Sequence, residues 1–173
     1  MQRSPVALSV AVALVAALGA LSCSGPIDLK QVLQVTDTSG GYHDVGIVDG
    51  RNKLVPRVTF RIKKSIDDGI RPLSLNVVFK KLPKPGAAVP PGSPTEEDWD
   101  EVFVQNVPFD GNQTAPVVIE TKAGYTGDPP QSRADILKHS MFQDVRVHIF
   151  AKHSASQWVE IASFDIPRQV LAQ

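Results

Sequence analysis

The sequence predicts an all-β fold: a single antiparallel β-sandwich of about seven strands, with one short helix near 132–140 and a signal peptide in front. Three observations support this prediction. Apolar and polar residues alternate in several short segments, which is the period of a strand with one buried face. Turn-forming residues separate these segments at short intervals, as they do in antiparallel sandwiches. Helical periodicity is scarce, and the 173 residues include one cysteine, so the core must form without an internal disulfide.

Three segments alternate most regularly and are expected to form the centre of the sandwich. They lie at 57–63, 73–80 and 145–152. Each places a row of large apolar side chains on one face and polar or charged side chains on the other. The inward residues are Val58, Phe60 and Ile62 in the first, Leu73, Leu75, Val77 and Phe79 in the second, and Val145, Val147, Ile149 and Ala151 in the third.

Four further strands are less regular, and in the last of them the apolar residues change from one face to the other along the strand. Val159 and Ile161 would face one side of this strand, whereas Phe164 and Ile166 would face the other. A β-bulge near Ala162 would bring all four to one face. These four strands are expected at 33–36, 101–107, 117–121 and 158–166.

Two other segments interrupt the strands. Ser132 followed by Asp135 resembles a capping box, so a short helix is expected over 133–139. The segment 83–95 holds five prolines and two glycines, and prolines lack the backbone donor that a sheet requires. This segment is therefore expected to be a surface loop between two strands of one domain.

The N-terminal residues have the pattern of a signal peptide. Arg3 precedes an uncharged apolar run, 6–21, which is shorter than the roughly 20 residues of a membrane-spanning helix. Small residues, Ala20 and Ser22, stand three and one positions before Cys23. This resembles the lipobox of bacterial lipoproteins, in which the cysteine is lipidated and becomes the first residue of the mature protein. Ordinary cleavage and a retained anchor helix are the alternatives; a single cysteine at this position favours lipidation.

These features divide the chain into a signal peptide (1–22), a lipidated N-terminus with a short tether (23–30) and a β-sandwich domain (31–171). The resemblance to lipoproteins implies a cell-envelope address with the membrane as a partner through the lipid. Ser24, where many inner-membrane lipoproteins have Asp, implies an outer membrane, with the domain facing the periplasm. Loss of Arg3 leaves 17 basic against 18 acidic residues, so no net field favours nucleic acid as a partner.

The hairpin formed by 58–64 and 73–79 is similar to the first hairpin of small extracytoplasmic immunoglobulin-like domains of the FxLYD and late-embryogenesis-abundant types. The similarity covers about residues 56–82. Lys64-Ser65 and Lys80-Lys81 stand where those families often have, respectively, an Asn or Gly and a Tyr-Asp pair. The resemblance implies an immunoglobulin-like sandwich outside the cytoplasm and a binding or accessory role, and it implies no reaction.

The sequence carries no recognisable catalytic motif. Gly-x-Ser-x-Gly, His-Glu-x-x-His, a phosphate-binding glycine-rich loop and the EF-hand spacing are absent. The histidines, His43, His139, His148 and His153, are expected to be solvated or at strand edges, because the last two, five residues apart, would face opposite sides of a strand. We therefore expect no enzyme, no cofactor and no metal site.

An acidic segment surrounds the first tryptophan. It could bind Ca²⁺ through oxygen ligands or form an acidic contact surface with an aromatic anchor. It could also be a solvated strand entrance that keeps an edge from pairing, which is the interpretation we favour. Carboxylates that follow one another along a strand alternate faces and do not converge on one ion. The segment comprises Glu96, Glu97, Asp98, Trp99, Asp100 and Glu101.

The expected function is a membrane-anchored, non-catalytic binding or accessory module of a cell-envelope complex, with an envelope protein as partner. Candidate partner-contact residues are Tyr42, on a flexible turn after Gly40-Gly41, together with Trp99 and Tyr125. Trp158 is expected in the core. The alternative is a periplasmic carrier for a lipid or small apolar ligand. The carrier would need a cavity between the sheets, lined by Phe60, Phe79, Phe103, Phe150 or Trp158.

Overall fold

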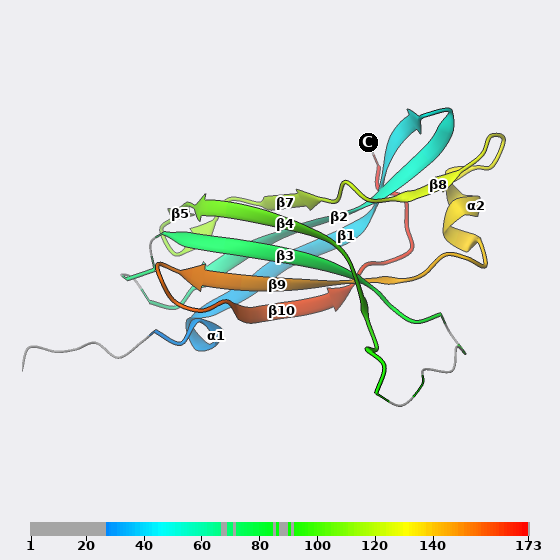
Figure 1. Cartoon of the computed structure of the whole chain (residues 1–173). Coiled ribbons are helices and arrows are strands. Elements are labelled where there is room, and N and C mark those ends of the chain that lie inside the picture. Colours follow the sequence, from blue (N-terminus) through cyan, green and yellow to red (C-terminus); the bar gives the residue numbers. More distant parts are fainter. Residues whose placement is uncertain are drawn as a thin grey trace, which may run out of the picture.

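The computed structural model describes residues 27–66, 69–70, 72–84, 86, 90 and 92–172. In this part of the chain ten strands and two short helices form two antiparallel sheets packed face to face (Figure 1). The prediction of an all-β sandwich with a short helix is therefore confirmed. The elements are α1 (Leu29–Val32), β1 (Leu33–Val48), β2 (Arg51–Lys64), β3 (Leu73–Lys81), β4 (Glu97–Val107), β5 (Phe109–Asp110), β6 (Gln113–Thr114), β7 (Val117–Glu120), β8 (Tyr125–Gly127), α2 (Arg133–Lys138), β9 (Val145–His153) and β10 (Val159–Asp165).

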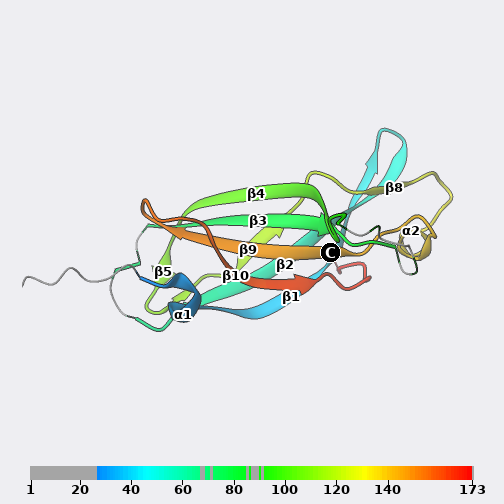
Figure 2. The ribbon, with the colours of Figure 1, turned by 60° about the horizontal axis from the view of Figure 1, so that its bottom comes forward.

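The six-stranded sheet is organised around β2. On one side β2 pairs with β1, and on the other it pairs in turn with β6, β7 and β8, while β5 joins β6. The four-stranded sheet has the order β10-β9-β3-β4, which places β4 at one margin (Figure 2). All of these pairings are antiparallel.

The core lies between the two sheets and is built from the alternating residues of the central strands. The three regular segments predicted from the sequence form most of β2, β3 and β9. Their inward side chains are inaccessible to solvent, and burial of such surface is the main favourable term in folding. The buried residues include Val58, Phe60, Ile62, Leu73, Leu75, Val77, Phe79, Val145, Val147, Ile149 and Ala151.

Several finer predictions are also confirmed. The register between β9 and β10 shifts between Glu160 and Ala162, which is the expected bulge. Helix α2 is capped by Ser132, whose side chain accepts a hydrogen bond from the Asp135 N–H while the Asp135 carboxylate accepts one from the Ser132 N–H. Helix α1 packs Leu29 into the core, so buried residues extend before the boundary expected at residue 31.

Strand β1 is much longer than the expected 33–36, and residues near the C-terminus stabilise its middle. The Tyr42 N–H donates to the Gln169 carbonyl at 2.8 Å, and the Leu171 N–H donates to the Tyr42 carbonyl at 2.9 Å. A Cβ on Gly41 would lie 2.7 Å from the Leu171 side chain and 2.9 Å from the Gln169 carbonyl oxygen. The glycine that suggested a flexible turn is instead required for this close approach.

The two ends of the sandwich differ. Helix α1 lies at one end, and the tip of the β1–β2 hairpin lies at the other with α2 beside it (Figures 1 and 2). Arg133 of α2 donates to the Asp44 carboxylate at 2.8 Å, and the Asn52 side-chain amide donates to the Gln131 carbonyl at 2.7 Å. These contacts attach the hairpin to the segment that carries α2.

Cys23, the signal peptide and the first residues of the tether lie outside the described residues, as do parts of the 83–95 segment. The described part of that segment contains no strand. Within the described ranges no helix is long and apolar enough to cross a membrane.

Candidate functional site

The three predicted partner-contact residues meet in one aromatic cluster that bridges the two sheets. Tyr42 of β1 and Tyr125 of β8 come from the six-stranded sheet, and Trp99 of β4 comes from the four-stranded sheet. The Tyr125 ring centroid lies 5.0 Å from that of Trp99, 6.1 Å from that of Tyr42 and 4.3 Å from that of Phe142. The Lys81 ammonium lies 4.6 Å from the centre of the Trp99 ring. Aromatic and cation–π contacts at these distances stabilise the packing between the two sheets at this cluster.

Tyr42 was wrongly expected on an exposed turn, because its side chain is 0% exposed. Its hydroxyl has no hydrogen-bond partner among the described residues, whereas the Tyr125 hydroxyl donates to the Gln143 carbonyl at 2.7 Å. Burial raises the pKa of Tyr125 to about 12 and raises the pKa of Tyr42 further, because the phenolate form loses its hydration. Tyr42 is therefore a core residue, while Trp99 and Tyr125 are half-buried.

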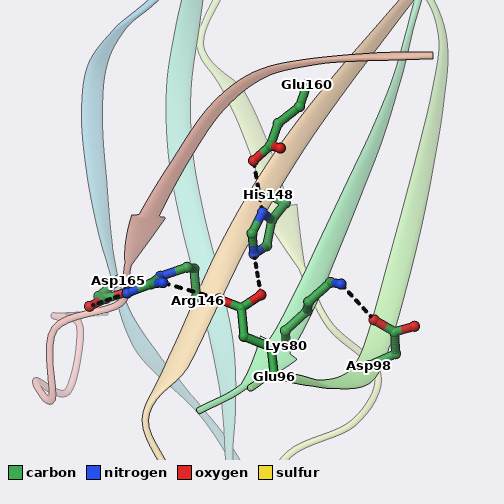
Figure 3. Close-up of polar contacts among 7 residues, drawn as sticks. All are labelled: Lys80, Glu96, Asp98, Arg146, His148, Glu160 and Asp165. Carbon is green, nitrogen blue, oxygen red and sulfur yellow. Dashed lines mark hydrogen bonds and ion pairs between the residues drawn. The ribbon is translucent and has the colours of Figure 1, made fainter. Parts of the chain in front are cut away.

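A charged network covers one part of the outer face of the four-stranded sheet (Figure 3). Its centre is His148 of β9, whose Nδ1 lies 2.8 Å from a Glu160 carboxylate oxygen and whose Nε2 lies 2.9 Å from a Glu96 carboxylate oxygen. Arg146 donates to Glu96 at 3.0 Å and to Asp165 at 2.6 Å. The network thus joins β9, β10 and the residue that directly precedes β4.

His148 contacts one carboxylate through each of its two ring nitrogens. A neutral imidazole has one N–H donor, so both ring nitrogens can donate to carboxylates only in the imidazolium form. The side chains of His148 and Glu96 are 14% and 18% exposed, which shields these contacts from water. Both ring nitrogens of His148 are thus engaged by carboxylates. The sequence interpretation of His148 as a solvated or edge histidine was wrong.

The acidic segment does not converge on one point. Glu96 belongs to the network around His148, Asp98 pairs with Lys80 at 3.1 Å, and Asp100 accepts the backbone N–H groups of Lys122 and Ala123. Among the described residues no group of three His, Cys, Asp or Glu side chains could hold a metal ion.

An aromatic pair crosses the other part of the same outer face. Phe103 of β4 is 55% exposed, Trp158 next to β10 is 40% exposed, and their ring centroids lie 6.1 Å apart. The Lys152 ammonium lies 5.8 Å from the centre of the Trp158 ring. The expectation that Trp158 lies in the core was wrong. Its neighbour in sequence is Val159, whose partly buried side chain packs against the core, and adjacent strand residues face opposite sides.

The five aromatic residues expected to line a carrier cavity lie on two sides of a sheet. Phe60 and Phe79 are fully buried, whereas Phe103 and Trp158 are exposed and Phe150 stacks beside His148 on the outer face. These residues therefore do not surround one internal space.

No protein-family model matches the chain, and no curated protein sequence is significantly similar to it.

Proposed function

We propose that this protein is a bacterial lipoprotein, lipidated at Cys23, that acts as a non-catalytic binding or accessory module of a cell-envelope complex. It sits at the outer membrane facing the periplasm and docks on an envelope protein through the outer face of its four-stranded sheet. The apolar run 6–21, the small residues before Cys23 and Ser24 after it support the anchor. The similarity of 56–82 to extracytoplasmic accessory domains supports the role.

The observation that carries the proposal is the exposure of the Phe103–Trp158 pair. Two large aromatic side chains lie in contact range of each other on a sheet face, at 55% and 40% exposure. Trp and Phe are enriched where proteins bind one another, and a fixed aromatic pair loses little conformational freedom on binding. The ion pairs around His148 border this pair and supply a polar margin, as is typical of a docking surface.

The position of α1 supports the proposal that a partner in the same membrane can reach the outer face of the four-stranded sheet. Helix α1 lies at the end of the sandwich away from the β1–β2 hairpin tip (Figure 1). Ile27, the first described residue, stands two positions before this helix. Ile27 stands four positions after Cys23, and a fully extended chain spans about 3.3–3.6 Å per residue, so the α1 end would lie within roughly 15 Å of the anchor. The outer face of the four-stranded sheet extends between the two ends and would stay open to a neighbour in the same membrane.

The test is in-cell crosslinking of the tagged full-length protein, followed by mass spectrometry of the products. One dominant envelope partner is expected, and Cys23→Ser, which mislocalises the protein, should remove it. Combined Phe103→Ala and Trp158→Ala should lower the yield at least about tenfold, which corresponds to about 1.4 kcal/mol. Val118→Ala is the matched control, because Val118 is 56% exposed on the other sheet.

Two results would contradict the proposal. A crosslink pattern that is unchanged by the aromatic double substitution would show that the partner does not dock on this face. A co-purifying lipid or small molecule without any protein partner would favour the alternative function, a periplasmic carrier for a lipid or small apolar ligand.

A further inference from the structure

No second strand pairs with the outer edge of β4 in the described part of the chain. The Asp100 carboxylate, at the start of this edge, accepts the backbone N–H groups of Lys122, Ala123 and Glu101. Strand β4 is the last of the four-stranded sheet and pairs with β3 alone. No backbone–backbone hydrogen bond reaches β4 from any other segment that the structure describes. The two long edges elsewhere are covered in part, since β10 lies against α1 and β1, and β1 pairs with residues 169–171. An open edge presents unpaired N–H and C=O groups to solvent.

The regular part of this edge has the length of one short strand. The β3–β4 register shifts between Leu73 and Leu75 and again between Phe79 and Lys80, and between these two irregularities it runs without a break from Asp100 to Val104. Five residues is close to the usual length of a β-strand. The run contains no proline and no lysine, the residues that most often protect an edge from pairing.

The apolar side chains of this edge are incompletely covered. Val102 and Val104 pack against the core but are only partly buried, and Phe103 on the opposite face is 55% exposed. In Figures 1 and 2 the strand forms the margin of its sheet. A strand added beside β4 would remove these three side chains from water while it satisfied the backbone groups.

The charges of the edge select the partner. Glu97 and Glu101 have no ion-pair partner among the described residues, because Lys80 pairs with Asp98 and Arg146 pairs with Glu96. Lys81, which stands opposite Glu97, has its ammonium over the Trp99 ring instead. A second copy of β4 would bring no positive charge, since the strand contains neither lysine nor arginine. The complementary strand therefore belongs to another protein and carries lysine or arginine toward one end.

We infer that the partner adds a strand to the edge of β4: an extended segment with basic residues beside Glu97 and Glu101 and apolar residues beside 102–104. This inference rests on the proposed function and specifies how the docking occurs. Acidic residues at an edge also discourage pairing with neutral or acidic strands. The two carboxylates, which lack an ion pair, thus reject unsuitable strands and attract a basic one, so that pairing becomes selective.

The test uses the full-length, membrane-anchored chain with the photoreactive amino acid p-benzoyl-phenylalanine at one of two positions. Gln105 is exposed next to the edge run, and Ser163 is exposed on the outer face beside His148, away from β4. Irradiation in cells should crosslink Gln105 to one envelope protein, within a segment that contains lysine or arginine. Glu101→Lys should lower that yield at least about tenfold, equivalent to about 1.4 kcal/mol. Asp110→Lys, the same charge change at the exposed position of β5, should leave it unchanged.

Each other outcome overturns a defined part of the reasoning. Crosslinks from Ser163 but none from Gln105 would refute strand addition and leave the proposed function standing, whereas no protein product from either position would contradict both. A Gln105 crosslink to a second copy of the chain would refute the inferred partner. Equal effects of Glu101→Lys and Asp110→Lys would refute the charge selection. Glu101→Gln, with a native urea midpoint, serves as a second variant if Glu101→Lys unfolds.

Discussion

The two tyrosines allow a prediction of opposite sign from one chemical change. Tyr42→Phe removes a hydroxyl that is fully buried and has no partner among the described residues. A buried polar group without a hydrogen bond costs about 1–3 kcal/mol, so removal of this hydroxyl should raise the free energy of unfolding by about 1 kcal/mol. The ring contacts with Tyr125 and Phe142 remain.

Tyr125→Phe is the matched control in the same cluster. It removes the hydrogen bond from the Tyr125 hydroxyl to the Gln143 carbonyl, which is 2.7 Å long. A typical hydrogen bond contributes about 0.5–1.5 kcal/mol net, so the free energy of unfolding should fall by about 1 kcal/mol. The two variants should therefore differ by about 2 kcal/mol, although both lose one oxygen atom.

Urea unfolding followed by tryptophan fluorescence measures both free energies, with equal slopes as the sign that the unfolded states are comparable. In thermal unfolding the two midpoints should lie about 4–8 °C apart, because 1 kcal/mol shifts the midpoint of a domain of this size by about 2–4 °C. If Tyr42→Phe lowers the free energy of unfolding by 1 kcal/mol or more, the hydroxyl has a partner and the reasoning fails.

Three further predictions concern titration, the charged network and the helix cap. No tyrosine absorbance change should occur near pH 10, since the pKa of Tyr125 is about 12 and that of Tyr42 is higher still. Both groups are neutral below pH 10 in either state. Their contribution to stability is therefore complete there and is lost as the pH rises from 10 toward 12; a tyrosinate signal in the folded protein at pH 10 would contradict this. His148→Leu removes the His148 contact from both Glu160 and Glu96, of which Glu96 keeps Arg146, so the free energy of unfolding should fall by about 1–3 kcal/mol, and His148→Gln, which retains a donor, should cost less. Equal urea midpoints for wild type and His148→Leu would show that the network contributes nothing. Ser132→Ala should cost about 1 kcal/mol through loss of the α2 cap, with Ser163→Ala, on an exposed strand position, as the neutral control.

The sandwich could be predicted because its central strands repeat a simple pattern. In β2, β3 and β9 every second residue is apolar, and the buried face of a strand has this period. The bulge near Ala162 followed from the same rule, since only an inserted residue brings Val159 and Phe164 to one face. Such features can be predicted from the sequence because they depend only on residues that are neighbours along the chain.

The candidate site could be predicted only in part, because its contacts join segments far apart in the sequence. Trp99 and Tyr125 were selected as exposed aromatic residues, and the structure places them in one cluster with Tyr42. Nothing in the sequence near Gly41 indicated that Leu171 would cover it. The contact of His148 with Glu96 spans 52 positions and depends on the strand order β9-β3-β4, which no local pattern reveals. Trp158 was misplaced for a different reason: it directly precedes Val159, which packs against the core, and the alternation of a strand places such a neighbour on the opposite face.

The contact between Tyr42 and residues 169–171 has a consequence for the order of assembly. The Gln169 side-chain amide donates to the Gly40 carbonyl across 129 positions, so one of the earliest strands depends on some of the last residues for its outer partner. Contacts that close such long loops form late in folding, because the chain must lose the entropy of loop closure before the contacts contribute favourable free energy. On the proposed route to the envelope, a chain that is still crossing the inner membrane has an uncovered β1 edge, and only complete export protects it from pairing with other chains.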